Sequence, residues 1–373
     1  MRFINAKVYT PDFTFQTGGF GVEEGRFVSV LEDGGPKGED LSGAYVIPGA
    51  IDIHCHGNSG VDFQRCKSPE DLAKVGRFLA RNGVTSFLFT TGSDYEDVLA
   101  ETYTQARRFM EDTPADCAYI HGMHMEGPFF SEAKKGAHNS KHLRVPDFDM
   151  FMRLHEVTGN NILITCLAAE FDNSVQFIEQ AKSVARVSIA HSNAGYVAAR
   201  AAFDAGASHL THLYNGMSPL AHREPGVIGA AADSPGVMVE LICDGIHVHE
   251  CAVRIAYKIF TPERIILISD NTPYCGLPDG EYGDNLVVRD KTTWLKDGTL
   301  SGTGICLFEG MTRVASFGIP LEEAVRCATY NPAKAIGVLD KTGTIENGKY
   351  ADFVVCNEDL CVLAVYVKGR KII

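Results

Sequence analysis

The chain has 373 residues, of which 34 are basic and 47 acidic, so its formal net charge is −13 at pH 7. This length is enough for one large α/β domain with a small satellite domain. Because the charge is spread along the chain without a basic stripe, nucleic acid and anionic membranes are not expected as partners. A phosphorylated small molecule is not excluded, since one arginine or a set of backbone amides can hold a phosphate.

The cysteines and the first residues of the chain bear on its compartment. Eleven cysteines form an odd set without a Cys-x-x-Cys pair, and many lie inside apolar runs. This pattern is typical of free thiols in a reducing compartment. The first residues lack the apolar core and cleavage site of a signal peptide, and no stretch reaches the roughly 18 apolar residues of a membrane span. We therefore expect a cytoplasmic protein.

Three regions follow one another along the chain. Residues 1–47 alternate short β-type runs with glycine-rich and acidic turns, which predicts small antiparallel strands. Residues 48–337 alternate apolar strands with helical stretches, a pattern typical of repeated β-α units and a parallel sheet. Residues 338–373 return to the β-type pattern. We expect the two ends to pair with each other as a small β-sandwich domain beside the central domain.

The central region contains eight predicted strands, one ending at His56 and the others at 86–90, 118–124, 162–166, 187–190, 209–212, 237–243 and 265–269. Eight strands in this order favour a (β/α)8 TIM-type barrel, whose active site lies at the carboxyl ends of its strands. A doubly wound open sheet is the alternative, but it would carry a glycine-rich phosphate loop after its first strand, which is not found here. The predicted helices include 69–79, 175–185, 196–205 and 321–335.

A pair of histidines, His54 and His56, closes the first predicted strand of the barrel. Side chains alternate faces along a strand, so both imidazoles point to the same side, where one metal ion can reach both. Taken alone, such a pair is more often an ordinary strand end than a metal site.

Three further metal-ligand types follow later strands. Glu126 comes after one strand, and His191 and His212 end two successive strands. Neutral imidazoles and a carboxylate suit a catalytic zinc or a similar divalent ion. By itself, a glutamate before Gly-Pro is more often a turn residue. His209 is expected to face away from the site, because it lies three residues before His212 on the same strand.

Other polar residues suggest catalysis and recognition. Asp270 ends the eighth strand and could take a proton from water activated by a metal, or it could cap the following turn. His247 would lie near a bound substrate. Arg223 offers a planar fork to phosphate oxygens, although an ion pair with Glu224 is the simpler reading. Residues 136–139 could cover a ligand or form an ordinary solvated loop.

These motifs together resemble one family over nearly the whole chain, the N-acetylglucosamine-6-phosphate deacetylases of the amidohydrolase superfamily. The resemblance rests on the segments Pro48-Gly-Ala-Ile-Asp52, His124-Met-Glu-Gly-Pro-Phe129, Lys135-Gly-Ala-His-Asn139, Ala190-His-Ser-Asn-Ala194, Thr211-His-Leu-Tyr-Asn215 and Asp297-Gly-Thr-Leu-Ser-Gly302. It implies a barrel with a small β domain made from both chain ends.

The resemblance also implies roles for single residues. Glu126, His191 and His212 match the metal ligands, and Asp270 matches the catalytic acid and base. Members that keep the histidine pair hold two metals with the glutamate bridging, so His54 and His56 join the ligand set. The positions that match sugar-phosphate contacts are Ala137, His138, Asn215, Gly216, Arg223, Asp244, Gly245, Ile246, His247, Leu300, Ser301 and Gly302.

Two details of this match concern substrate binding. Gly216 replaces the usual alanine, which could loosen a backbone contact to the sugar. In relatives the arginine that matches Arg223 reaches a neighbouring subunit's site, so a homodimer or a higher homo-oligomer is implied.

The expected function is metal-dependent hydrolysis of the acetamido group of N-acetyl-D-glucosamine 6-phosphate, giving glucosamine 6-phosphate and acetate. Metal-bound hydroxide would attack the carbonyl with Asp270 as general base and acid. One or two divalent ions per chain are expected, either zinc, iron, manganese or cobalt. The alternatives are a related amidohydrolase acting on N-acetylgalactosamine 6-phosphate or a small cyclic amide, and a barrel retained as a binding or assembly protein.

Overall fold

The computed structural model describes residues 1–31, 37–282 and 286–373. Eight parallel strands form its central sheet in the order β15-β14-β13-β12-β11-β10-β9-β6. Their bounds are β6 Ala50–Asp52, β9 Val84–Thr91, β10 Tyr119–Phe129, β11 Ile162–Leu167, β12 Arg186–Ile189, β13 His209–Leu210, β14 Met238–Ile242 and β15 Ile265–Ile268. These strands form a nearly closed barrel, which confirms the predicted fold class.

The chain segments after the first and last strands bring the two edges of the barrel together. The Ser269 hydroxyl donates to Asp52 Oδ2 at 2.5 Å, and the Asp270 amide donates to the His54 carbonyl at 2.9 Å. Asp270 and His54 are therefore neighbours although they lie at opposite ends of the barrel sequence.

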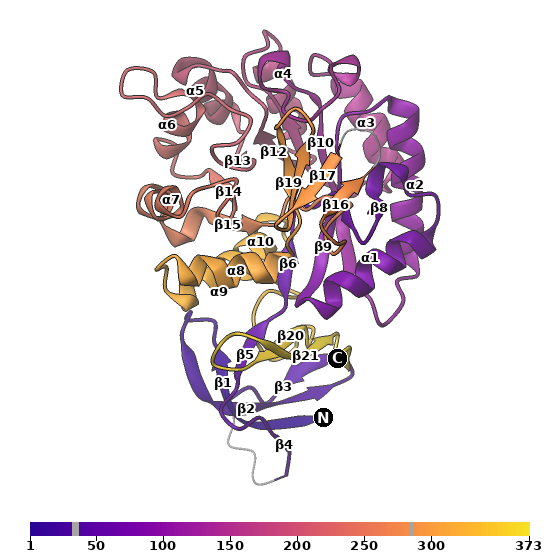
Figure 1. Cartoon of the computed structure of the whole chain (residues 1–373), viewed down its shortest axis with the longest axis vertical. Helices are drawn as coiled ribbons and strands as arrows, with labels where there is room; N and C mark the ends of the chain where they lie inside the picture. Colours follow the sequence, from indigo (N-terminus) through magenta and orange to yellow (C-terminus); the bar gives the residue numbers. More distant parts are fainter. Residues whose placement is uncertain (32–36, 283–285) are drawn as a thin grey trace.

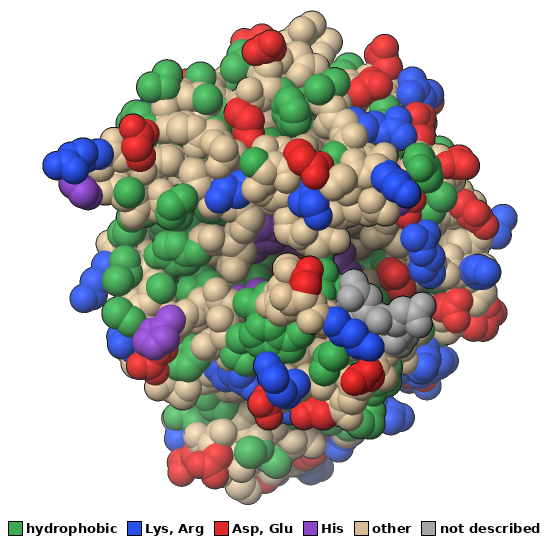
Figure 2. Space-filling view, turned by 45° about the horizontal axis from the view of Figure 1, so that its top comes forward, with side chains coloured by type: hydrophobic (Ala, Val, Ile, Leu, Met, Phe, Trp, Pro, Cys, Tyr) green, Lys and Arg blue, Asp and Glu red, His purple; other side chains and the backbone are tan. Residues whose placement is uncertain are grey.

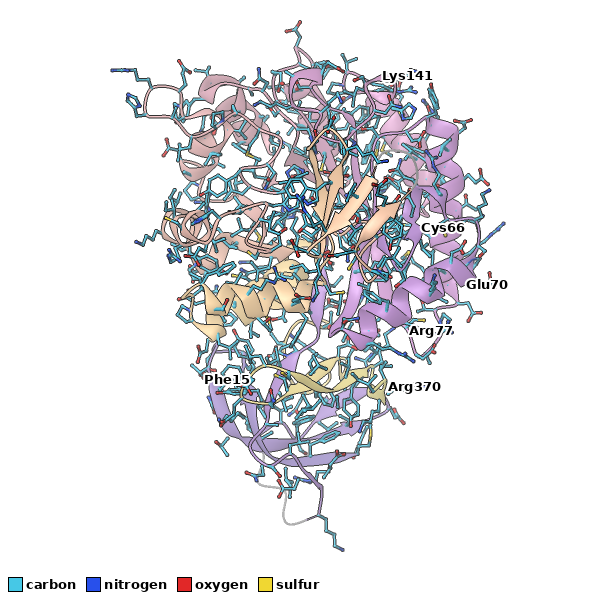
Figure 3. All side chains as sticks on the ribbon, viewed as in Figure 1. Phe15, Cys66, Glu70, Arg77, Lys141 and Arg370 are labelled. Carbon is cyan, nitrogen blue, oxygen red and sulfur yellow. The ribbon has the colours of Figure 1, made fainter. Side chains whose placement is uncertain are left out.

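Helices surround the barrel (Figure 1). Their bounds are α1 Pro69–Arg81, α2 Glu96–Glu111, α3 Phe148–Val157, α4 Ser174–Ala181, α5 Tyr196–Ala205, α6 Gly226–Ala232, α7 Glu250–Arg264, α8 Leu307–Ser316, α9 Leu321–Ala328 and α10 Tyr330–Ala335. In α1 the side chain of Ser68 caps the first turn and Pro69 takes the first helical position, as local propensity favours. Figure 3 shows Glu70 and Arg77 on this helix, where both are exposed. Among the described residues, no helix combines the length and the apolar character that crossing a membrane would require.

Three details differ from the sequence prediction. The helix predicted over 321–335 is two helices, α9 and α10, because Thr329 leaves the helical conformation and Pro332 follows within one turn. The strand predicted over 118–124 continues to Phe129, through Gly127-Pro128, and its pairing with β11 is irregular between Met125 and Phe129, where proline cannot donate. The first barrel strand ends at Asp52, so the histidine pair lies just beyond it.

The two chain ends form a separate mixed sheet below the barrel (Figure 1). Its strands are β1 Arg2–Tyr9, β2 Phe15–Glu23, β3 Arg26–Val28, β4 Glu39–Asp40, β5 Tyr45–Pro48, β20 Phe353–Cys356, β21 Val362–Val367 and β22 Arg370–Lys371. Strand β5 pairs antiparallel with β20, which joins the N- and C-terminal segments as expected. Figure 3 labels Phe15 and Arg370 on this sheet. The domain boundaries near residues 47 and 338 stay predictions.

Aromatic rings show how this terminal sheet is shaped. The ring centroids of Phe3 on β1 and Tyr366 on β21 lie 5.4 Å apart, although β5 and β20 separate the two strands. Neighbouring strands are about 4.8 Å apart, so rings on strands three places apart could not touch across a flat sheet. The sheet therefore curls around a core that includes Phe20 and Phe353.

A four-stranded antiparallel sheet, which the sequence did not predict, follows the last barrel strand. Its strands are β16 Gly280–Tyr282, β17 Leu286–Arg289, β18 Thr292–Leu295 and β19 Leu300–Thr303. The amide of Thr303 donates to the carbonyl of Asp270 at 2.9 Å. This bond anchors β19 at the carboxyl end of the barrel. A short hairpin of β7 Gly57–Asn58 and β8 Val61–Asp62 lies after the histidine pair.

Candidate metal centre

The carboxyl ends of the strands surround a cavity of about 570 Å³. Figure 2 shows histidine side chains inside a hollow on this face of the molecule. The predicted residues that line the cavity are His56, Glu126, Ala137, His138, His191, His212, Asn215, Gly216, His247, Asp270, Leu300, Ser301 and Gly302. They come from segments spread over most of the barrel sequence. His54 lies beneath the floor with no exposed surface.

One group of metal-ligand type is Glu126, His191 and His212. Glu126 Oε1 lies 3.3 Å from His191 Nε2 and 3.1 Å from His212 Nε2, and the two Nε2 atoms are 3.1 Å apart. Ligands placed tetrahedrally about 2.0–2.1 Å from one ion are about 3.3 Å from each other. The three atoms therefore have the spacing of a ligand set.

Hydrogen bonds on the far side of each ring set the direction of these ligands. His191 Nδ1 donates to the Lys134 carbonyl at 2.8 Å, and His212 Nδ1 donates to the Asn215 carbonyl at 3.0 Å. A carbonyl can only accept, so the proton of each neutral ring lies on Nδ1 and the Nε2 lone pair faces the cluster. Two lone pairs and a carboxylate that face one point fit a divalent cation there.

A second group shares Glu126. His54 Nε2 and His56 Nε2 are 3.2 Å apart, and His56 Nε2 lies 3.2 Å from Glu126 Oε2. The other oxygen of this carboxylate faces the first group, so Glu126 lies between the two groups. Asp270 Oδ1 is 3.2 Å from His56 Nε2 and 3.5 Å from His54 Nε2. The histidine pair therefore adds a second set of possible metal-ligand atoms beside the first.

The buried carboxylates of Glu126 and Asp270 attract positive charge to the site. Burial would raise the pKa of Glu126 and of Asp270, but the neighbouring histidines outweigh it and hold both pKa values below the usual range. Burial opposes the charging of His56, yet Asp270 and Glu126 raise its pKa to about 9. Protons or a metal ion can supply the charge that these carboxylates attract. At His138, burial lowers the pKa to about 3, so this ring is neutral.

The backbone is strained where three of these residues leave their strands. His191, His212 and Asp270 have φ values of 43°, 31° and 48°. Residues other than glycine rarely adopt this left-handed conformation, and it persists only where surrounding structure enforces it. Each turn lies directly after a barrel strand and keeps its side chain at the cavity.

Four predicted substrate contacts do not line this cavity. Asp244 lies behind His247, where its Oδ2 accepts from His247 Nδ1 at 2.6 Å, while Gly245 and Ile246 form the turn between them. Arg223 lies on the exposed segment 219–224 and borders a separate surface pocket beside α5.

Sequence reasoning missed several residues of the site. The unpredicted residues that line the cavity include Asp62, Gln64, Arg65, Ser93, Asp94, His142, Thr272 and Thr299. Asp94 could have been found, because it follows a barrel strand as the predicted residues do. Glu240, which contacts His54, was also missed although it is the single charged residue in the apolar run 237–243.

The chain is similar to known proteins over most of its length. Residues 45–372 match the amidohydrolase family. The chain belongs to the amidohydrolase family. This amidohydrolase is 33% identical over 375 residues to the N-acetylglucosamine-6-phosphate deacetylase of Bacillus subtilis strain 168, covering 97% of this chain and 94% of that protein. It is also 33% identical over 329 residues to the N-acetylgalactosamine-6-phosphate deacetylase of Escherichia coli O157:H7, covering 87% and 86% of the two chains.

A solved structure is similar over the full length of this amidohydrolase. It is an aspartate-to-alanine mutant of the N-acetyl-D-glucosamine-6-phosphate deacetylase from Mycobacterium smegmatis in complex with N-acetyl-D-glucosamine-6-phosphate. The TM-score is 0.92 at 28% identity, and the match covers 100% of this chain and 99% of that chain. The family is metal-dependent, and among the described residues the two groups that share Glu126 could bind metal at the cavity.

Proposed function

We propose that this amidohydrolase hydrolyses the acetamido group of N-acetyl-D-glucosamine 6-phosphate, giving glucosamine 6-phosphate and acetate. The observation that carries the proposal is the position of Asp270, whose carboxylate borders the same cavity as Glu126, His191 and His212. The relative from Bacillus subtilis supports the choice of substrate, since it matches nearly the whole chain.

One or two divalent ions would bind at the two ligand groups that share Glu126. Glu126, His191 and His212 would hold the first, and His54, His56 and Glu126 the second. A bound divalent ion supplies a Lewis acid, which polarises the acetyl carbonyl and lowers the pKa of water. The protein keeps the ligand rings oriented through their Nδ1 hydrogen bonds, so little reorganisation is needed when an ion binds.

Asp270 would move the proton of the reaction. Its carboxylate is ionised because His54 and His56 hold its pKa below the usual range. It can therefore accept a proton from the attacking water and return it to the nitrogen as the C–N bond breaks. The amide and water are thereby converted to an amine and acetate. The bond from the Thr303 amide to the Asp270 carbonyl holds this residue in position.

The sugar phosphate would be held by other residues that line the same cavity. Asp244 accepts from His247 Nδ1, which leaves His247 Nε2 for the ligand. Asn215 and Gly216 line the cavity beside the first ligand group, and residues 300–302 of the small sheet line it from β19. These groups would orient the acetamido group toward Asp270.

Arg223 would act in a homodimer. It is exposed and lies outside its own chain's cavity, which supports a role at the phosphate of a partner subunit. Arg223→Ala should raise the KM for the phosphorylated sugar by about 10–100-fold, because a hydrogen bond to a charged group contributes about 1.5–3 kcal/mol. Light scattering of the parent should show a dimer or a higher oligomer. A monomer, or an unchanged KM, would contradict this role.

N-acetylgalactosamine 6-phosphate is the second candidate substrate, and the relative from Escherichia coli favours it. The two sugars are epimers, so the same metal centre could act on either.

One assay tests both substrates. Acetate release would be measured with both 6-phosphates and with unphosphorylated N-acetylglucosamine, before and after metal removal and restoration. We expect the highest kcat/KM with N-acetylglucosamine 6-phosphate and a loss of turnover on metal removal. Preference for the galacto epimer would replace the first substrate with the second. Turnover that survives complete metal removal would contradict the mechanism.

A further inference from the structure

The chain contains a third group of metal-ligand type, His54, His124 and Glu240, entirely beneath the cavity. Hydrogen bonds already occupy its members. His124 Nδ1 donates to the Ile53 carbonyl at 2.8 Å, and His124 Nε2 accepts from the Cys166 thiol at 3.1 Å. His54 Nδ1 uses its proton for Glu240. The group is therefore a hydrogen-bonded support and not a site for a further ion.

Glu240 is the centre of this support. It lies in the middle of β14 with no exposed surface, where an ionised side chain is costly unless it is paired. Its Oε2 accepts from His54 Nδ1 at 2.8 Å and from the His212 amide at 3.3 Å. Its Oε1 accepts from His209 Nε2 at 3.0 Å. Every contact of this carboxylate is thus made with a donor, and two of the contacts reach proposed metal ligands.

The bond to His54 decides which nitrogen of that ring faces the cavity floor. An ionised carboxylate can only accept, so the ring proton lies on Nδ1 and the lone pair on Nε2. That Nε2 lies 3.2 Å from His56 Nε2 and 3.5 Å from Glu126 Oε1. The rings of His191 and His212 are held by main-chain carbonyls. Among these three rings, only that of His54 depends on a side chain, and that side chain is charged.

We propose that Glu240 is the positioning residue of the second metal site: it holds the His54 ring in the tautomer and orientation that bind the ion beside His56. His209, which lies outside the ligand groups, acts through Glu240 by donating to its other oxygen. This inference rests on the proposed function only in requiring two ions per chain. Removal of such an outer-shell carboxylate typically weakens metal binding by about 10–100-fold.

The test uses the full-length protein loaded with Co²⁺ and graded chelator competition, with bound ions counted by elemental analysis. In the parent we expect two ions that are released in separate steps. In Glu240→Gln the ion bound by His54 and His56 should be released at a chelator concentration about 10–100-fold lower than in the parent. The ion of the Glu126, His191 and His212 group should keep its parental release. Glu240→Asp withdraws the carboxylate from His54 by one methylene and should weaken the binding of the same ion. This variant keeps the test informative if the glutamine variant does not fold.

Two controls separate positioning from a general structural role. Asp352→Asn alters another buried carboxylate, which contacts none of the ligands, and should leave both release steps unchanged. In a His54→Gln background, Glu240→Gln should cause no further change in metal release, because the ring it holds is gone.

The outcomes are distinguishable. Parental release of both ions from Glu240→Gln and Glu240→Asp would overturn the inference and leave the deacetylase proposal intact. Equal weakening of both ions would also overturn it, since it would indicate a general loss of structure. A parent with one ion would overturn it together with the two-metal part of the function. Acetate release, measured on the parent separately, tests the activity without reference to Glu240.

Discussion

Buried carboxylates lie at both ends of the barrel, and their neighbours differ in kind. Near the terminal sheet, Asp352 accepts from the Tyr119 hydroxyl at 2.7 Å, from the Thr342 hydroxyl at 3.0 Å and from the Lys368 amide at 2.7 Å. At the other end, Glu126 faces ring nitrogens, and the outward hydrogen bonds of His191 and His212 turn lone pairs toward it.

The difference separates a structural carboxylate from a functional one. Asp352 is satisfied by donors, and it joins barrel residue Tyr119 to the β21–β22 turn at Lys368. The cluster around Glu126 is a set of acceptors that needs an added cation, supplied as protons or as a metal ion. Burial alone does not distinguish Asp352 from Glu126, because both side chains are almost fully buried. The two carboxylates are distinguished by the chemistry of the groups that contact them.

The largest expected effect is at the mouth of the barrel, with Asp270→Asn. An amide cannot take up the proton of the attacking water, so kcat should fall by about 10²–10⁴-fold or more, while the fold and the metal content stay parental. Acetate release and elemental analysis of the same sample check this. An active variant would defeat the assignment of Asp270, and a variant that loses metal would reassign it as a ligand.

Replacing the histidine pair, His54 and His56, tests whether it binds a second metal ion. In the double variant His54→Gln/His56→Asn, bound metal should fall from two ions per chain toward one, because the second group loses both rings while the group of Glu126, His191 and His212 is intact. Elemental analysis of protein purified with added metal measures the count. If the double variant binds as much metal as the parent, the pair is structural.

Asp352→Asn tests the structural carboxylate near the terminal sheet. Asparagine has one acceptor oxygen where aspartate has two, so it cannot accept from both hydroxyls and from the Lys368 amide together. The free energy of unfolding should therefore fall by about 1–3 kcal/mol. Turnover per folded molecule should not change, since the residue contacts none of the cavity residues. Urea unfolding and acetate release measure the two quantities. Loss of turnover at parental stability would mean that the two ends of the barrel are coupled.

The smallest expected effect is that of Gly216→Ala. In this backbone, with φ at 60°, a Cβ atom would lie 2.9 Å from His191 Nδ1. The left-handed conformation costs residues other than glycine about 1–2 kcal/mol, and the His191 ring would have to shift. We expect a loss of unfolding free energy of this size with weaker binding of the first metal ion, measured by urea unfolding and chelator competition. Parental values would show that the segment adapts to alanine.

The local pattern predicted much of the site because each barrel strand is an apolar run with a polar residue behind it. His191, His212 and Asp270 each follow such a run, and the structure brings all three to the cavity. The unpredicted β16–β19 sheet lacks this pattern, since its strands are short and only partly buried. The division of 321–335 into two helices was missed because the apolar period continues across Thr329 while its backbone does not.

The barrel, the pairing of the two chain ends and the residues that end the strands could be predicted from the sequence, because they depend on short-range patterns of apolar and polar residues. Which atoms face one another depends on the folded structure. Glu240 and His54 are 186 residues apart, yet their bond sets the tautomer of the His54 ring. Glu126 likewise faces both ligand groups only because the barrel nearly closes. The direction of a lone pair depends on partners distant in sequence, and no local pattern records it.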